Sequence, residues 1–177
     1  ASFSTPEIEQ ADLSPLMLEL AVWGVQEIDE LKWVSLPPSS AQSVARQLLS
    51  QLDALDANGM ATEHGRMMNK LPCHPRIAHM LLRSEDLGLM PLACDIAGLI
   101  EERDPLSQEA GVDLNIRIEG LRRHRREQRT GGKWDRIVRN VNYYLDLLKI
   151  EADDASVDDY ETGILLAQAY PERIAFA

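Results

Sequence analysis

Apolar residues recur at helical spacing along most of the chain. Between Ala41 and Leu52 they fall at positions i, i+3, i+4, i+7, i+8 and i+11, and a second stripe runs from Trp134 to Leu148. This period places the apolar side chains on one face of an α-helix, which is then buried against a neighbour. The pattern predicts a mainly α protein.

Capping residues mark the helix boundaries in the first part of the chain. Ser14 followed by Pro15 is typical of a helix start, and Gly24 of a helix end. Ser39 with Gln42 fits a capping box ahead of a second helix. A short strand is expected around residues 31–34, between these two helices.

A turn follows the second helix. Asn58-Gly59 has the residues of a two-residue type I′ hairpin, in which both positions adopt positive φ. Thr62 can then cap a short third helix. This order predicts a small winged-helix-like domain over residues 13–72, preceded by an entering linker over residues 1–12.

The remaining residues, 73–177, predict a helical bundle. Pro72 and Pro75 forbid a continuous helix through the junction, because each lacks an N–H and disfavours helical backbone in the residue before it. Pro75 can open a new helix, and four further helical segments follow, with Thr130-Gly131-Gly132 interrupting the pattern. Five helices with short connections make a bundle.

Composition indicates a cytoplasmic protein. No run approaches the roughly 20 apolar residues of a membrane span, and the N-terminus lacks the basic-then-apolar order of a signal peptide. Cys73 and Cys94 are the two cysteines in the sequence. Their helical surroundings and unpaired spacing favour reduced thiols over a disulfide.

The sequence contains no convincing catalytic or metal-binding motif. Gly131-Gly132-Lys133 resembles the end of a phosphate-binding loop, but Trp134 stands where the Ser or Thr that binds Mg²⁺ would be. His74 and His79 are five positions apart, not the four of a zinc-binding helix. His64 and His124 lie in polar sequence and are expected to be solvated. No catalytic, cofactor-binding or metal-binding residue is therefore predicted in this chain.

Charge is concentrated in one segment. Nine of the 18 Lys and Arg residues lie between Arg117 and Arg139, with three acids, in a chain of net charge −11. Arginines from Arg122 to Arg129 recur at i, i+3, i+4 and i+7, which suits them to contact successive phosphates. Alternatively, they pair with acidic residues elsewhere in the chain or in a neighbour. The residues alone leave both readings open.

Several stretches together resemble the DEAH-box helicases. Pro6-Glu7-Ile8 with Asp12-Leu13 and Trp23-Gly24 is similar to the pattern that opens the winged helix after the second motor domain of that family. Gly65-Arg66-Met67-Met68 with Leu71-Pro72 and His74-Pro75-Arg76 continues it. Glu102-Arg103-Asp104-Pro105 and Tyr170-Pro171-Glu172-Arg173 resemble the bacterial HrpB-type branch. The likeness covers nearly the whole chain, and departs at Leu36-Pro37-Pro38, where the family has Asp-Pro-Pro.

This resemblance implies a piece of a longer ATP-dependent helicase. The motor motifs are absent from the sequence, so ATP, Mg²⁺ and hydrolysis would belong to the parent's motor domains and not to this piece. In the family the winged helix packs on the motor, and the bundle, or ratchet domain, closes over single-stranded nucleic acid. The chain would then be an accessory nucleic-acid-guiding module of a DEAH-box RNA helicase.

The expected partners follow from the same resemblance. They are single-stranded nucleic acid, RNA rather than DNA, and the motor domains of the same chain, with no membrane. The residues expected to contact nucleic acid are Arg122, Arg123, Arg125, Arg126, Arg129, Lys133 and Arg136. The alternative is a scaffold that docks on the motor or on a partner without contacting nucleic acid.

Overall fold

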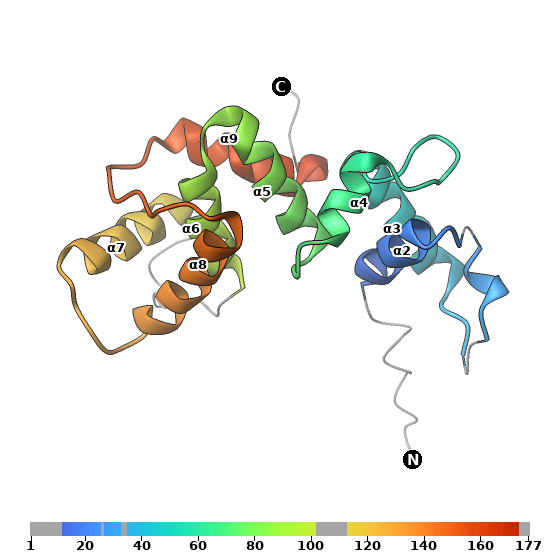
Figure 1. Cartoon of the computed structure of the whole chain (residues 1–177), viewed down its shortest axis with the longest axis horizontal. Coiled ribbons are helices and arrows are strands. Elements are labelled where there is room, and N and C mark those ends of the chain that lie inside the picture. Colours follow the sequence, from blue (N-terminus) through green and yellow to red (C-terminus); the bar gives the residue numbers. More distant parts are fainter. Residues whose placement is uncertain (1–11, 26, 33–34, 102–112, 174–177) are drawn as a thin grey trace, which may run out of the picture. The chain divides into compact units, whose positions relative to one another are not determined.

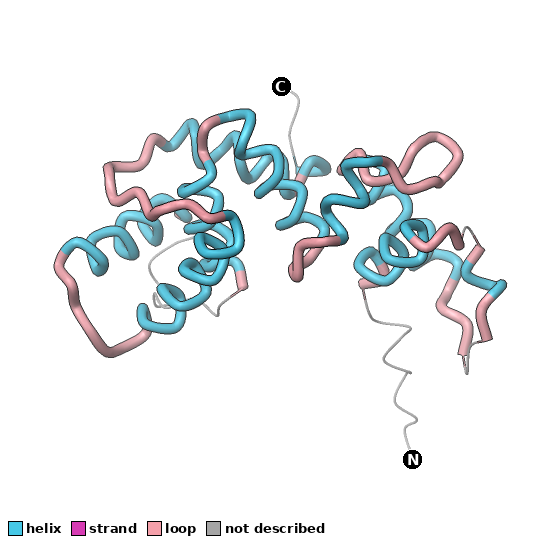
Figure 2. The backbone as a smooth tube through the Cα atoms, in the orientation of Figure 1, coloured by secondary structure: helices cyan, strands magenta, loops and turns pink. Residues whose placement is uncertain are grey.

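The structure, a computed structural model, describes residues 12–25, 27–32, 35–101 and 113–173. Within these ranges the chain forms eight α-helices and no β-strand beyond a single antiparallel bridge between Leu55 and Ala61 (Figures 1 and 2). The helices are α2 (Ser14–Val22), α3 (Ser39–Gln51), α4 (Glu63–Asn69), α5 (Pro75–Leu87), α6 (Met90–Ile100), α7 (Leu114–Arg126), α8 (Trp134–Leu148) and α9 (Asp159–Ala169), with 3₁₀ turns η1 (Ile28–Glu30) and η3 (Pro171–Arg173).

The predicted fold class is confirmed: the protein is mainly α, a small winged-helix-like module followed by a helical bundle. The chain divides into two compact units, Ala1–His79 and Met80–Ala177. The predicted domain limits of 1–12, 13–72 and 73–177 stay a prediction. Trp33 and Val34, on which the predicted strand depends, lie outside the described residues.

In the first unit, α2 packs against α3 and α4. The buried side chains include Leu18, Leu49, Leu52 and Met68. Gly24 follows α2 with φ of +85°, as expected of a residue that ends a helix. Thr62 caps α4 by accepting a hydrogen bond from the amide of Gly65 at 2.9 Å. Both signals were readable in the sequence.

The turn before α4 is not the predicted type I′ hairpin, because only Gly59 adopts positive φ. Asp56 and Met60 pair across a three-residue loop, with the amide of Asp56 donating to the Met60 carbonyl at 2.9 Å. The carboxylate of Asp56 also accepts hydrogen bonds from the amides of Asn58 and Met60. That carboxylate holds Asn58 in ordinary turn geometry, so one left-handed residue suffices.

The second unit is built around α6, in which every residue from Leu92 to Leu99 is buried. Helix α8 packs closely across it, and α7 contacts α6, α8 and α9. The close approach of α8 depends on Gly98, since a Cβ there would lie 2.4 Å from Cγ2 of Val141. Cys94 is a buried thiol. Burial, together with the charge of the neighbouring Asp95, raises its pKa to about 12, which is consistent with a role in the core.

The histidines differ from expectation. His64 is not simply solvated, because its Nε2 lies 2.7 Å from Nδ1 of the buried His79.

In the described part of the chain, no helix has the length and apolar content needed to cross a bilayer.

Candidate nucleic-acid interface

The basic segment forms α7, a seven-residue connection and the start of α8 (Figure 1). Asp113 caps α7 by accepting a hydrogen bond from the amide of Asn115. The last turn of α7 carries Arg123, His124, Arg125 and Arg126, where cations interact favourably with the helix dipole. Gln128, Gly131 and Gly132 then adopt positive φ, which reverses the chain into α8. The predicted interruption at residues 130–132 is therefore a turn between two helices.

Two of the predicted binding residues are engaged inside the protein. Nε of Arg122 lies 2.9 Å from the carboxylate of Asp95, and Nη1 of Arg125 lies 2.7 Å from the other oxygen of the same carboxylate. Asp95 is 1% exposed, and Arg122 3%. Arg122 thus presents almost no surface to a phosphate, and Arg125 presents little. The alternative raised by the sequence, pairing with the chain's own acids, is realised at both positions.

The same face of α7 holds the acidic stretch between α8 and α9. Arg125 Nε lies 2.6 Å from a carboxylate oxygen of Asp154, and Arg122 donates to the carbonyl of Ala155 at 2.7 Å. Arg126 donates to the carbonyl of Asp154 at 2.6 Å. Glu119, one turn earlier on α7, accepts a hydrogen bond from the amide of Val157. Four α7 side chains therefore fasten a segment that forms no helix of its own.

Burial and neighbouring charges shift the pKa values of Asp95 and Arg125 in opposite directions. Burial raises the pKa of the Asp95 carboxyl, and the hydrogen bonds and charges of Arg125 and Arg122 work against that rise. For Arg125, burial alone would lower the pKa, but Asp95 and Asp154 outweigh it and the pKa is raised. The Arg125 guanidinium is therefore held charged, as expected for a buried group that faces two carboxylates.

The other five predicted residues are exposed: Arg123, Arg126, Arg129, Lys133 and Arg136. Arg139, which was not among the predicted contacts, is exposed as well. Nε of Arg129 lies 2.5 Å from the carboxylate of Glu127, and both side chains are largely exposed. An exposed pair of this kind contributes little to stability, so it leaves Arg129 available to another anion. We call these six residues the exposed basic surface.

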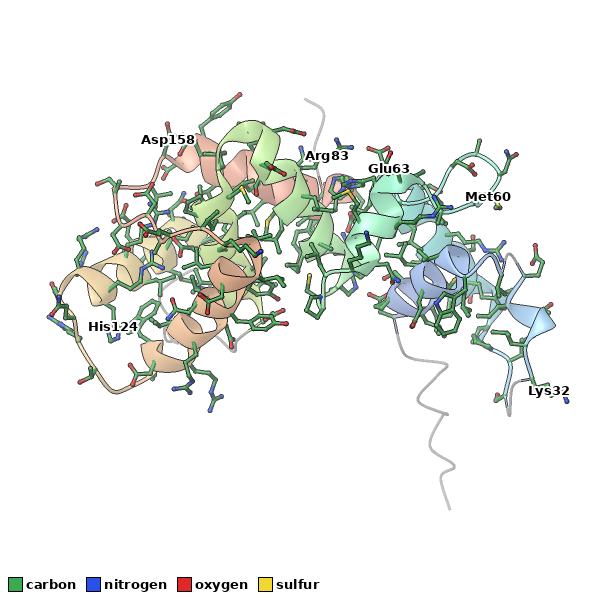
Figure 3. The ribbon with its side chains drawn as sticks, in the orientation of Figure 1. Lys32, Met60, Glu63, Arg83, His124 and Asp158 are labelled. Atoms are coloured by element: carbon green, nitrogen blue, oxygen red, sulfur yellow. The ribbon has the colours of Figure 1, made fainter. Side chains whose placement is uncertain are left out.

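Two hollows lie against this surface. One of about 300 Å³ is lined by Ile116, Gly120, Arg123, His124, Glu127, Arg129 and Trp134. The other, of about 490 Å³, is lined by nine residues that include His124, Arg129, Asp135 and Arg139. His124 and Arg129 line both, so the hollows adjoin. His124, which is labelled in Figure 3, was expected to be solvated, but it is 8% exposed. Its Nε2 lies 3.5 Å from the Asp135 carboxylate.

Sequence reasoning missed Asp95 and Trp134. Asp95 carried a signal, since it is the one charged residue in an otherwise apolar helix and a buried charge requires a partner. Trp134 fits the apolar stripe of α8, but its partly exposed ring also lines a hollow. The role assigned to the seven basic residues stays a prediction, and burial limits it to the five exposed ones.

Comparison with known proteins identifies relatives along almost all of the chain. "ATP-dependent RNA helicase HrpB" of Escherichia coli (strain K12) is 29% identical over 175 residues, which are 99% of this chain and 19% of that protein. "Probable ATP-dependent RNA helicase DHR1" of Saccharomyces cerevisiae is 32% identical over 113 residues, 64% of this chain and 9% of that protein. The crystal structure of E. coli DExH-box NTPase HrpB superposes with a TM-score of 0.74 at 28% identity, covering 98% of this chain and 19% of that one.

The chain is similar to the DEAH/RHA helicases in sequence and in fold over almost its whole length. No model of a known protein family matches it separately. The chain spans 19% or less of the length of each of these relatives, and corresponds to an accessory region of a DEAH-box RNA helicase. The family resemblance drawn from the sequence motifs is confirmed. Similarity to the DEAH/RHA helicases concerns the fold, whereas the contacts of the exposed basic surface depend on its own residues.

Proposed function

We propose that this region of a DEAH/RHA helicase guides single-stranded RNA, which it contacts through the exposed basic surface. One observation carries the proposal: six Lys and Arg side chains are exposed around the α7 to α8 connection, in a chain of net charge −11. Arg126 is one of them, although it also donates to the carbonyl of Asp154. A local positive surface on an acidic protein favours one defined contact with an anion over nonspecific binding of anions.

The proteins named as relatives are RNA helicases, which favours RNA as the anion. Motor domains would bind ATP and Mg²⁺ and hydrolyse the ATP, and the effect of hydrolysis would be transmitted to this region. A phosphate-release assay on the 177-residue chain alone is then expected to show no turnover.

Binding of a fluorescent single-stranded RNA at different salt concentrations tests the proposal. Each phosphate contact to a single strand contributes a slope of about −0.7 to the plot of log affinity against log salt. Four contacts predict a slope near −3, equivalent to a loss of about fiftyfold between roughly 50 and 200 mM salt. The charge-reversal variant R123E/R129E is expected to lose most of this affinity.

A matched charge reversal in the first unit supplies the control. Arg66 and Lys70 are exposed in the first unit, so R66E/K70E makes the same change in net charge away from the exposed basic surface. Its affinity should remain close to that of the wild type. Arg125 is unsuitable for this test because its substitution would also disturb the buried Asp95.

A scaffold without RNA contact is the second candidate, and the engagement of Arg122 and Arg125 by the protein's own carboxylates favours it. Absence of RNA binding by the wild type at about 50 mM salt would overturn the guiding role and leave the scaffold. Equal losses in R123E/R129E and R66E/K70E would place the contact elsewhere and would also contradict the proposal.

A further inference from the structure

The smaller of the two hollows combines an aromatic wall with a cationic rim. Trp134, Ile116 and Gly120 supply apolar surface, while Arg123 and Arg129 lie at its edge. Ile116 is 52% exposed, so this apolar surface is not covered by the rest of the described structure. We call this site the Trp134 hollow.

The indole of Trp134 is held in place by α7. A Cβ at Gly120 would lie 2.8 Å from Cζ2 and 2.9 Å from Cη2 of the ring, so only glycine lets the ring lie this close. The ring of His124 also lies beside it, with centroids 6.4 Å apart. A ring fixed on one edge and partly exposed is a preorganised stacking surface, which loses little freedom when a second ring covers it.

The charges around the Trp134 hollow specify what kind of ring would enter. Arg123, Arg129 and Glu127 at the rim together carry a charge of +1, which favours a ring attached to negative charge, and Glu127 is paired with Arg129. An exposed ion pair exchanges partners at small cost, so a phosphate can take the place of Glu127. Bases of a single strand combine a flat aromatic face with a phosphate on each side, and aromatic residues within basic grooves are the usual way to bind them.

The adjoining hollow extends the cationic path. It shares Arg129 with the Trp134 hollow and adds the exposed Arg139. Arg123 and Arg129 therefore line one hollow and Arg129 and Arg139 the other, so these three arginines border two adjoining hollows. A strand lying along these three side chains would pass directly beside Trp134.

We propose that the Trp134 hollow receives one base of single-stranded RNA, stacked on the indole, with its flanking phosphates on Arg123 and Arg129. This proposal rests on the proposed RNA-guiding function and assigns it a base-binding position. A stacked base quenches tryptophan emission, whereas contact with phosphate alone does not.

The test compares RNA affinity and tryptophan emission in the 177-residue chain and its variants. With a ten-nucleotide single-stranded RNA at about 50 mM salt, the wild type is expected to bind with partial quenching. W134L, which removes the π face, is expected to lose about tenfold in affinity, within the range measured for single stacked bases. W23L makes the same change at a tryptophan that is 69% exposed in the first unit, and should leave affinity unchanged.

W134F keeps the test decisive if W134L fails to fold. Phenylalanine retains a stacking face, so W134F is expected to keep its affinity within about threefold while the RNA-dependent quenching disappears. Inorganic polyphosphate serves as the phosphate-only probe and should bind without quenching. Quenching that persists in W134F, or that polyphosphate produces equally, would overturn the proposal.

The two proposals fail in different ways. If the wild type does not bind RNA, both are lost. If RNA binds and R123E/R129E abolishes binding, but folded W134L binds like the wild type, only the base-stacking position is lost. Quenching of Trp134 that grows with protein concentration in the absence of RNA would assign the hollow to a second copy of the chain, and would also overturn the base-stacking proposal.

Discussion

Nε2 of His74 lies 2.6 Å from a carboxylate oxygen of Asp12, a residue 62 positions earlier in the sequence, and this contact joins the starts of α2 and α5. Nδ1 of the same ring accepts a hydrogen bond from the amide of Arg76 at 3.1 Å, so Nε2 carries the hydrogen and donates it to Asp12. The other oxygen of Asp12 accepts hydrogen bonds from both the amide and the hydroxyl of Ser14. At the start of each helix a side chain thus accepts a hydrogen bond from an amide of the first turn, and these two side chains are bonded to each other.

This arrangement resembles a catalytic triad in composition but not in geometry. Oγ of Ser14 lies 3.3 Å from Nε2 of His74. That nitrogen already holds a hydrogen directed at Asp12, and therefore cannot accept the hydroxyl proton of Ser14. A general base and its orienting carboxylate must use different ring nitrogens. The cluster is structural.

Replacing His74 with alanine is expected to destabilise the first unit by about 1 to 2 kcal/mol, because α5 loses its cap and Asp12 loses its partner. Urea unfolding followed by circular dichroism measures this change. Asp12→Asn keeps an acceptor for the Ser14 amide and should cost less. The reverse order of the two variants would contradict the capping role of His74.

Acid should weaken the same cluster. Partial burial by itself would raise the pKa of Asp12, but the hydrogen bonds from Ser14 and His74 outweigh it and hold that pKa below its ordinary value of 3.8. A carboxyl with a lower pKa when folded contributes stability at higher pH, and loses that contribution as pH falls through the folded value. Between about pH 5 and 3, the wild type should therefore lose more unfolding free energy than D12N.

Asp95→Asn is expected to be among the most costly single substitutions in the second unit. The change removes the negative charge that faces two buried guanidinium groups, and breaking a buried pair typically costs about 3 to 5 kcal/mol. The Asp154 side chain is 35% exposed and pairs with Arg125 but not with Arg122. Asp154→Asn should therefore lower the free energy of unfolding by roughly 1 kcal/mol or less. Chemical denaturation of the two variants compares them directly. Similar costs would mean that Asp95 is not the centre of the cluster.

Two glycines in helices should respond oppositely to alanine. A methyl group added at Gly163 in α9 would meet no neighbour within 4 Å, so Gly163→Ala should stabilise the protein by up to about 1 kcal/mol. At Gly98 the added methyl would meet Val141, and α6 and α8 would have to separate, so Gly98→Ala should destabilise it. Thermal unfolding would show the two shifts. A stabilising Gly98→Ala would contradict the close packing of α6 on α8.

Local rules predicted the helix limits well, since caps and breakers act within a few residues. Gly24, Thr62 and Pro75 fall at the helix ends that the sequence indicated. The type I′ turn was wrong because the side chain of Asp56, two residues before Asn58, takes part in the turn. The capping box at Ser39 also failed, since Gln42 donates instead to the carbonyl of Pro37.

The sequence pattern could not predict which residues pair across the fold. Arg122 and Arg123 are adjacent and chemically identical, yet one is buried on Asp95 and the other is exposed. Which face of α7 turns inward depends on the position of Asp95, 27 positions earlier on another helix. A basic segment therefore predicts a local excess of charge, but not how much of that charge reaches the surface.

The stretch from Glu151 to Val157 has no helix of its own, and its order comes from Glu119, Arg122, Arg125 and Arg126. Its amides and those of α7 should therefore exchange with deuterium as one cooperative unit, although this stretch has the appearance of a loop. An event that pulled α7 away from Asp95 would release a flexible, negatively charged tether at the same moment.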